Sequence, residues 1–195
     1  MLDEATKNAV ADYVLDQYDR ERIKLFVDIY DSRETIRLRV INKFAEQLTG
    51  ALSDALPVSD GWKVDADELL ANPLERYSSL NVRRSTWTWD KEAYVSIEAQ
   101  SVGAGDWVVG VRAMQNRDRL RAAAIERWGQ GKISNGWPWY RSLGHGSEFG
   151  SSELGDWRTG AAILALAEGS RGVYGKRLCD RIVEMSKTVD SVPST

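Results

Sequence analysis

The stretch from Gly129 to Trp157 restricts the possible folds of this chain more than any other. It is rich in glycine and serine, so it cannot be helix or strand throughout. It also carries the run WPWY at residues 137–140, and His145, the only histidine in the chain. Large aromatic side chains are usually buried. We therefore interpret residues 129–157 as a long ordered loop that its aromatic rings anchor on a core.

Composition limits the class of protein. The 195 residues are 43% hydrophobic and 28% charged, which is typical of a soluble globular domain. The single cysteine, Cys179, excludes an internal disulfide and a cysteine-based zinc site. A net charge of −3 argues against a broad nucleic-acid footprint. The sequence contains no secretory signal and no apolar run long enough for a membrane span, so we expect a cytoplasmic protein.

The first third of the chain predicts helices. Apolar residues recur at three- and four-residue spacings from Glu4 to Tyr30, and the charged cluster Asp19–Arg22 indicates a turn between two helices. A second apolar stripe runs from Ile36 to Leu56, and Pro57 ends it. We therefore predict a helical N-terminal segment over residues 1–57 and a mixed domain over residues 58–195.

The middle of the chain predicts strands. Apolar and polar residues alternate over residues 84–89, 94–100 and 107–112, with a Gly-rich turn at residues 103–106. Helical patterns follow at residues 117–128, 159–168 and 173–189. The predicted fold is α+β, with N-terminal helices, a small antiparallel sheet of about three strands, and C-terminal helices packed on it.

A carboxylate on the central predicted strand suggests a catalytic alternative. Glu98 and Gln100 share one face of that strand, and Asp90 or Asp106 could supply a second carboxylate for Mg²⁺. Metal-dependent nucleases use such sets, but glutamine stands here where they have lysine. His145 has no second histidine to complete a metal cluster. We expect no catalytic residue and no cofactor, with magnesium only under the nuclease alternative.

Candidate binding residues come from aromatic and basic segments. Trp137, Trp139 and Tyr140 could stack on bases or sugars, with Arg141 beside them in an ion pair that holds the segment. Two basic helical faces, represented by Arg37 and Arg119, are further candidate contact surfaces.

One family resemblance covers the last half of the chain. Its elements are a strand with Tyr94, Ile97 and Glu98, the segment DWVVGVR, a short helix, the segment SNGWPWYRSL, the pair Asp156-Trp157 and a C-terminal helix. This order resembles the C-terminal, non-nuclease region of certain prokaryotic proteins of the PD-(D/E)XK nuclease superfamily. Residues 1–57 lack the Asp…Glu-x-Lys pattern of the nuclease core. The resemblance therefore implies an accessory region and transfers no catalytic residue.

These observations favour a non-catalytic binding module that recognises a protein partner or nucleic acid. The resemblance implies a phage, mobile-element or defence context. Two alternatives stay open: a metal-dependent nuclease that uses Glu98, and an inhibitor or structural protein that acts by oligomerisation or by occluding a partner. The sequence leaves the oligomeric state open.

Overall fold

The protein is described by a computed structural model covering residues 3–15, 20–87, 90–91, 93–144, 148–149 and 151–192. It divides into two compact units, residues 1–39 and residues 40–195. The division lies within helix α3 (Arg33–Ala55), upstream of the boundary expected at Pro57. The reason is that α3 buries apolar side chains such as Phe44 and Leu48 in the second unit, so its C-terminal part belongs to that unit's core.

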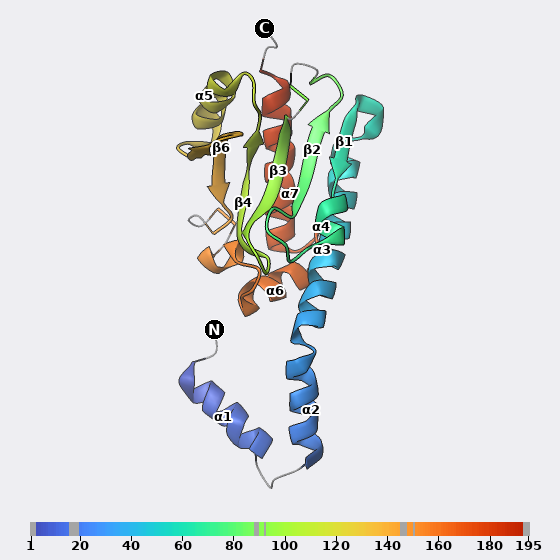
Figure 1. Ribbon diagram of the computed structural model, residues 1–195, viewed down its shortest axis with the longest axis vertical. Helices are drawn as coiled ribbons and strands as arrows, with labels where there is room; N and C mark the ends of the chain where they lie inside the picture. Colours follow the sequence, from blue (N-terminus) through green and yellow to red (C-terminus); the bar gives the residue numbers. More distant parts are fainter. Residues whose placement is uncertain are drawn as a thin grey trace. The chain divides into compact units, whose positions relative to one another are not determined.

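The N-terminal unit contains α1 (Glu4–Leu15), α2 (Arg20–Asp31) and the start of α3 (Figure 1). Asp3 caps α1, because its carboxylate accepts a 2.7 Å hydrogen bond from the backbone N–H of Thr6. The helices α1 and α2 confirm the prediction of helix that the apolar periodicity gave. The charged cluster that we interpreted as a turn lies partly inside α2, which begins at Arg20, while Asp19 lies outside the described residues.

The second unit confirms an α+β fold, but its antiparallel sheet has six strands, not about three. The strands lie in the order β1-β2-β3-β4-β6-β5, with every neighbouring pair antiparallel. Their bounds are β1 Trp62–Asp65, β2 Ser79–Arg84, β3 Tyr94–Ser101, β4 Gly105–Arg112, β5 Lys132–Ser134 and β6 Trp137–Ser142.

The strand predicted at residues 84–89 was wrong. Strand β2 ends at Arg84, and a turn follows at Ser85. Leu80 and Val82 of β2 pair with Ile97 and Val95 of β3, and all four are buried. The alternating residues that form strand β2 therefore lie upstream of the tryptophans on which the prediction was based. Trp89 lies outside the described residues.

The aromatic segment is also not a loop throughout. Residues 132–142 form a β-hairpin, in which WPWY begins β6 at the second position from the sheet edge. A register irregularity between Lys132 and Ser134 lies opposite Pro138. A proline has no N–H for the ladder and is tolerated at such a bulge. The presence of proline and glycine therefore misled the loop prediction.

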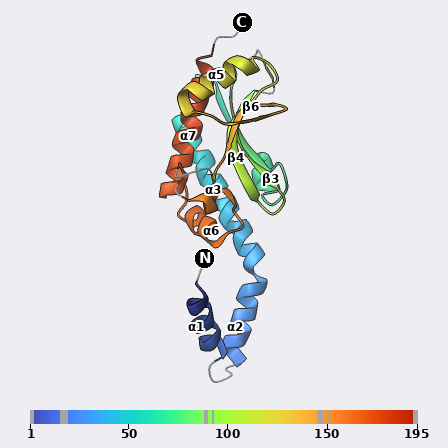
Figure 2. The same ribbon diagram turned by 90° about the vertical axis from the view of Figure 1, so that its left-hand side faces the viewer.

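Helices cover one face of the sheet. Figures 1 and 2 show α7 (Val173–Asp190) and the C-terminal part of α3 on this face. Helix α5 (Arg117–Trp128) packs against β6 and α7, and α6 (Gly160–Ala167) precedes α7. Helix α4 (Asp67–Ala71) links β1 to β2. No helix of the described residues is long and apolar enough to cross a membrane.

Candidate functional site

The two faces of the sheet differ in chemistry. On the helix-covered face the paired strands present apolar residues, among them Ile97, Val109 and Trp107, which are buried. The opposite face, which we call the open face, carries the polar half of the same alternation. Its residues on β3 are Tyr94, Ser96, Glu98 and Gln100, as the sequence predicted. A functional surface can therefore lie on either face, and we describe each in turn.

A tryptophan stack forms the centre of the helix-covered side. The rings of Trp107 and Trp157 lie 3.8 Å apart and nearly parallel, and both are buried. The indole N–H of Trp157 donates a 3.0 Å hydrogen bond to the hydroxyl of Tyr174 in α7. Burial raises the pKa of Tyr174 far above its usual value. Trp157 thus joins the chain before α6 to the sheet and to α7, which is a structural role.

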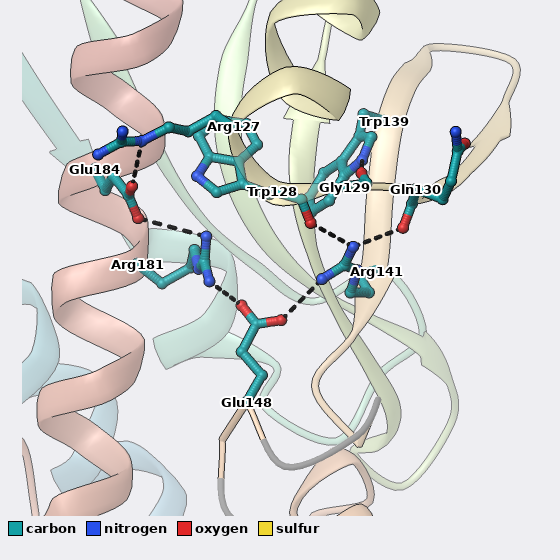
Figure 3. Close-up of polar contacts among 9 residues, drawn as sticks. All are labelled: Arg127, Trp128, Gly129, Gln130, Trp139, Arg141, Glu148, Arg181 and Glu184. Atoms are coloured by element: carbon teal, nitrogen blue, oxygen red, sulfur yellow. Dashed lines mark hydrogen bonds and ion pairs between the residues drawn. The ribbon is translucent and has the colours of Figure 1, made fainter.

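Arg141 of β6 lies on the same side and is surrounded by acceptors (Figure 3). Its guanidinium donates hydrogen bonds of 2.6 Å to the carbonyls of Trp128 and Gln130 at the end of α5, and forms a 3.1 Å ion pair with Glu148. The C-terminal carbonyls of a helix carry partial negative charge and favour such a cation. We expected a network of Arg141 with Asp156 and Arg158; the structure pairs Arg141 with Glu148 instead, and Asp156 with Arg158.

The network continues into α7. Glu148 also pairs with Arg181 at 2.5 Å, Arg181 with Glu184 at 3.4 Å, and Glu184 with Arg127 of α5 at 2.8 Å (Figure 3). Alternating charges link β6, α5 and α7 through the segment at Glu148. Because most of these groups already have partners, we interpret the network as a clamp rather than a binding site.

The open face carries a row of basic and aromatic side chains that crosses five strands. Lys63 of β1 pairs in register with Arg83 of β2, whose guanidinium lies 5.5 Å from the ring centre of Tyr94 in β3. Tyr94 pairs in register with Arg112 of β4, whose guanidinium lies 5.4 Å from the ring centre of Trp137 in β6. We call these five residues the cross-strand row. With strands about 4.8 Å apart it extends over about 19 Å.

Two adjacent hollows lie along the cross-strand row and share Tyr94. The first has a volume of about 350 Å³ and is lined by Lys63, Asp65, Asn81 and Arg83, among others. The second, of about 320 Å³, lies between Arg112, Met114 and Gly136. Both volumes are in the range of small-molecule sites. One ring with cations on both sides can stack a planar group and neutralise anions attached to it.

The cross-strand row is only partly neutralised. Lys63 is paired with Asp65 at 2.8 Å; this hydrogen bond raises the pKa of Lys63 and lowers that of Asp65. Arg112 is paired with Glu98 at 2.8 Å. Arg83 donates to a carbonyl, that of Lys91, at 3.2 Å, so its charge is not balanced by that contact. The row therefore keeps a cationic centre beside Tyr94.

The residues of the nuclease alternative are not brought together. The carboxylate of Asp90 accepts hydrogen bonds of 2.5 and 2.8 Å from the backbone N–H groups of Met114 and Gln115, beyond the end of β4. Asp106 is the second residue of β4, about 20 Å from that end at about 3.4 Å per residue, and its carboxylate accepts a hydrogen bond from the hydroxyl of Ser101.

Glu98 lies between these two positions and is 3% exposed. Burial, more than any other cause, raises its pKa, while Arg112 and a 2.9 Å hydrogen bond from Gln100 oppose the rise. Within the part of the chain that the structure describes, no three His, Cys, Asp or Glu side chains gather closely enough to hold a metal ion. The acidic residues are thus used in structural contacts.

The remaining candidates differ in exposure and in the contacts that they make. Trp139 is 1% exposed and packs on Trp128, so it offers no surface to a ligand, whereas Tyr140 is half-buried beside Trp137. Arg119 is exposed on α5. Arg37 belongs to the N-terminal unit and pairs with Glu34 at 2.5 Å. His145 lies outside the described residues.

The sequence-based candidates included one member of the cross-strand row, Trp137, and missed the other four: Lys63, Arg83, Tyr94 and Arg112. The alternation within β3 and within β4 does not decide whether Arg112 lies on the same face as Tyr94, because that depends on the register between the two strands. The register is set by strand pairing and not by either strand alone. Comparisons of the chain with models of protein families, with curated proteins and with solved structures find no match.

Proposed function

We propose that this chain is a non-catalytic module that binds single-stranded nucleic acid across the open face of its sheet. The observation that carries the proposal is the cross-strand row, in which Tyr94 lies between Arg83 and Arg112. Bases stack on aromatic rings, and phosphates pair with arginine and lysine. Sheets that present aromatic residues on an open face are a recurrent platform for single-stranded RNA.

The net charge of the chain is compatible with a small nucleic-acid contact surface. A net charge of −3 disfavours a long electrostatic track, but the row places three cations and an aromatic ring within about 19 Å. The two hollows on either side of Tyr94 have room for groups of nucleotide size. Trp137 is buried, so in this proposal its ring supports the guanidinium of Arg112 from the protein side. The phage, mobile-element or defence context remains part of the proposal.

The test is binding of fluorescently labelled single-stranded DNA and RNA, measured by anisotropy at low salt with the full chain. Tyr94→Ala should weaken binding about 5- to 150-fold, since a stacked base contributes about 1–3 kcal/mol. Tyr94→Phe keeps the ring and should bind like the parent. The matched control is Tyr77→Ala: Tyr77 is half exposed, where Tyr94 is partly buried, and it too lies beside an arginine, Arg76, but it is not part of the row.

Each outcome decides the matter. Absence of binding to any oligonucleotide at low salt would contradict the proposal, as would equal losses in the Tyr94 and Tyr77 variants. Mg²⁺-dependent cleavage of the oligonucleotide that disappears in Glu98→Ala would favour the nuclease alternative instead. A stable complex with a protein partner, without nucleic-acid affinity, would favour the inhibitor alternative.

A further inference from the structure

The N-terminal unit exposes apolar side chains and has no core of its own. None of the side chains that the structure describes between Asp3 and Arg39 is buried. Helix α2 nevertheless carries large apolar residues that are about half exposed, including Phe26, Val27 and Tyr30. Pieces of about 40 residues or fewer usually need an external stabiliser such as oligomerisation. The unit therefore offers an apolar surface that a partner can cover.

The apolar residues of α2 form a stripe. Ile23, Phe26, Val27 and Tyr30 follow the spacing i, i+3, i+4, i+7, which places them on one side of the helix. A second row, Arg20, Lys24, Asp28 and Asp31, has spacings of four, four and three, and lies along the flank of the stripe. An apolar stripe with a charged flank is the pattern by which helices select a partner.

The order of the flanking charges is unusual. Basic residues stand at the N-terminal end of α2 and acidic residues at its C-terminal end. The helix dipole favours the opposite arrangement, by about 0.3–1 kcal/mol for each charge. The stability of the isolated helix therefore does not explain this order. Among the described residues of the N-terminal unit, the ion pairs involve Glu4 with Lys7 and Glu34 with its neighbours, so these four flank charges remain available.

We propose that α2 pairs antiparallel with α2 of a second copy of this chain about a two-fold axis. In such a pair the same flank of each helix meets itself, and contacts are reciprocal. Arg20 then lies opposite Asp31 of the other copy, and Lys24 opposite Asp28. The midpoint of the first pairing falls between Leu25 and Phe26 and that of the second at Phe26; the two differ by half a residue, about 0.75 Å along the axis, so one register brings all four charges opposite each other. A parallel pair would place like charges together.

The first experiment is sedimentation velocity of the full chain over a concentration series, with a dissociation constant in the micromolar range expected for a pair of short helices. Val27→Asp should abolish association. Ile29→Asp is the matched control: both residues are β-branched and half exposed, at 51% and 52%, but Ile29 lies off the stripe. A monomer at every concentration, or equal effects of the two variants, would overturn the proposal.

Charge reversal tests the antiparallel register. Lys24→Asp alone should raise the dissociation constant about tenfold or more, because it places like charges opposite each other twice. Adding Asp28→Lys to the same chain should restore the parent value. Failure of the double variant to recover would contradict the pairing. Neither position belongs to a strand of the sheet, so nucleic-acid binding, measured separately, reports on the proposed function independently.

Cross-linking tests the orientation directly. In a Cys179→Ser background, chains carrying Arg20→Cys are mixed with chains carrying Asp31→Cys and treated with a short bismaleimide. The mixed dimer should form, because these positions face each other. Arg20→Cys alone should not cross-link, because its two copies would be about 17 Å apart along the axis at 1.5 Å per residue. Efficient cross-linking of Arg20→Cys with itself would overturn the antiparallel arrangement.

Discussion

The two faces of the sheet use arginine in opposite ways. On the helix-covered side, Arg141 is about one-sixth exposed and engaged by Glu148 and by two carbonyls at the end of α5. On the open side, Arg83 donates to a single carbonyl and lies against the ring of Tyr94. The same side chain is thus a fixed structural tie on one face and an available cation on the other.

The difference follows from desolvation. A guanidinium that loses water must recover hydrogen bonds within the protein, and Arg141 does so through Nη1 and Nη2, although its buried Nε has no partner among the described residues. At the open face water can satisfy the guanidinium, and a phosphate can replace that water. The number of protein acceptors around an arginine therefore distinguishes a structural arginine from one available to a ligand better than its position in the sequence does.

The strongest test of the helix-covered side is Trp157→Ala. Removing this buried ring deletes the stack on Trp107 and the hydrogen bond to Tyr174, and it leaves a cavity. We expect a loss of about 3–5 kcal/mol in the free energy of unfolding, measured with urea. Val108→Ala, a buried position on the other face, is the comparison and should cost much less. Equal losses would mean that the two faces contribute alike.

Arg141→Ala should follow, with a loss of about 2–3 kcal/mol in the free energy of unfolding. It leaves the carbonyls of Trp128 and Gln130 without their donor and removes one cation from Glu148. Arg141→Lys should recover little, because the guanidinium uses two separate nitrogens, Nη1 for Glu148 and Nη2 for the two carbonyls, whereas lysine has one nitrogen at a different position. Arg119→Ala, which removes an exposed arginine of α5, should change stability by less than about 0.5 kcal/mol. Full recovery by lysine would contradict the clamp.

The sequence predicted best where a single element decides the outcome. The helix at residues 117–128 has the expected bounds, because Gly129 ends it with a positive φ of 76°, which glycine adopts more readily than other residues. The stripe ended by Pro57 and the alternation of β3 are likewise local properties. These signals do not depend on what the element packs against.

Prediction failed where the partner decides. Pro138 suggests a loop, but it lies at an irregularity where Pro138 and Trp139 of β6 face a single residue of β5, and β6 pairs with β4 from Trp139 onward. Glu148 is one of several acidic residues after Arg141, and its selection depends on the approach of Arg181 from α7. The cross-strand row exists only in the register that joins five strands. The sequence of a single strand does not reveal tertiary pairing of this kind.

The open face is tested by the salt dependence of binding. Arg83→Gln should weaken binding of a single-stranded oligonucleotide several-fold and lower the slope of log K against log salt concentration by about 0.7, the value for one phosphate contact. Arg119→Gln removes the same charge from α5 and should leave the slope unchanged. If instead Arg119→Gln lowers the slope, the contact surface is the basic face of α5 and not the cross-strand row.

The smallest expected effect on stability concerns Glu98, whose side chain points to the open face but is buried there. Burial raises its pKa above the usual 4.5, against the influence of Arg112 and Gln100 and with that of Glu68. The folded chain then binds this proton more tightly than the unfolded chain, so the contribution of Glu98 to stability falls as pH rises from about 4.5 through the raised pKa.

Glu98→Gln keeps an acceptor for Arg112 and Gln100 but cannot ionise. We therefore expect the parent protein to lose stability relative to Glu98→Gln as the pH of urea denaturation is raised from 4 to 8. A difference that is constant, or that favours the parent at higher pH, would show that the ion pair with Arg112 outweighs burial. Glu98 would then hold Arg112 in place as firmly as Glu148 holds Arg141, and the contrast between the two faces would rest on Arg83 alone.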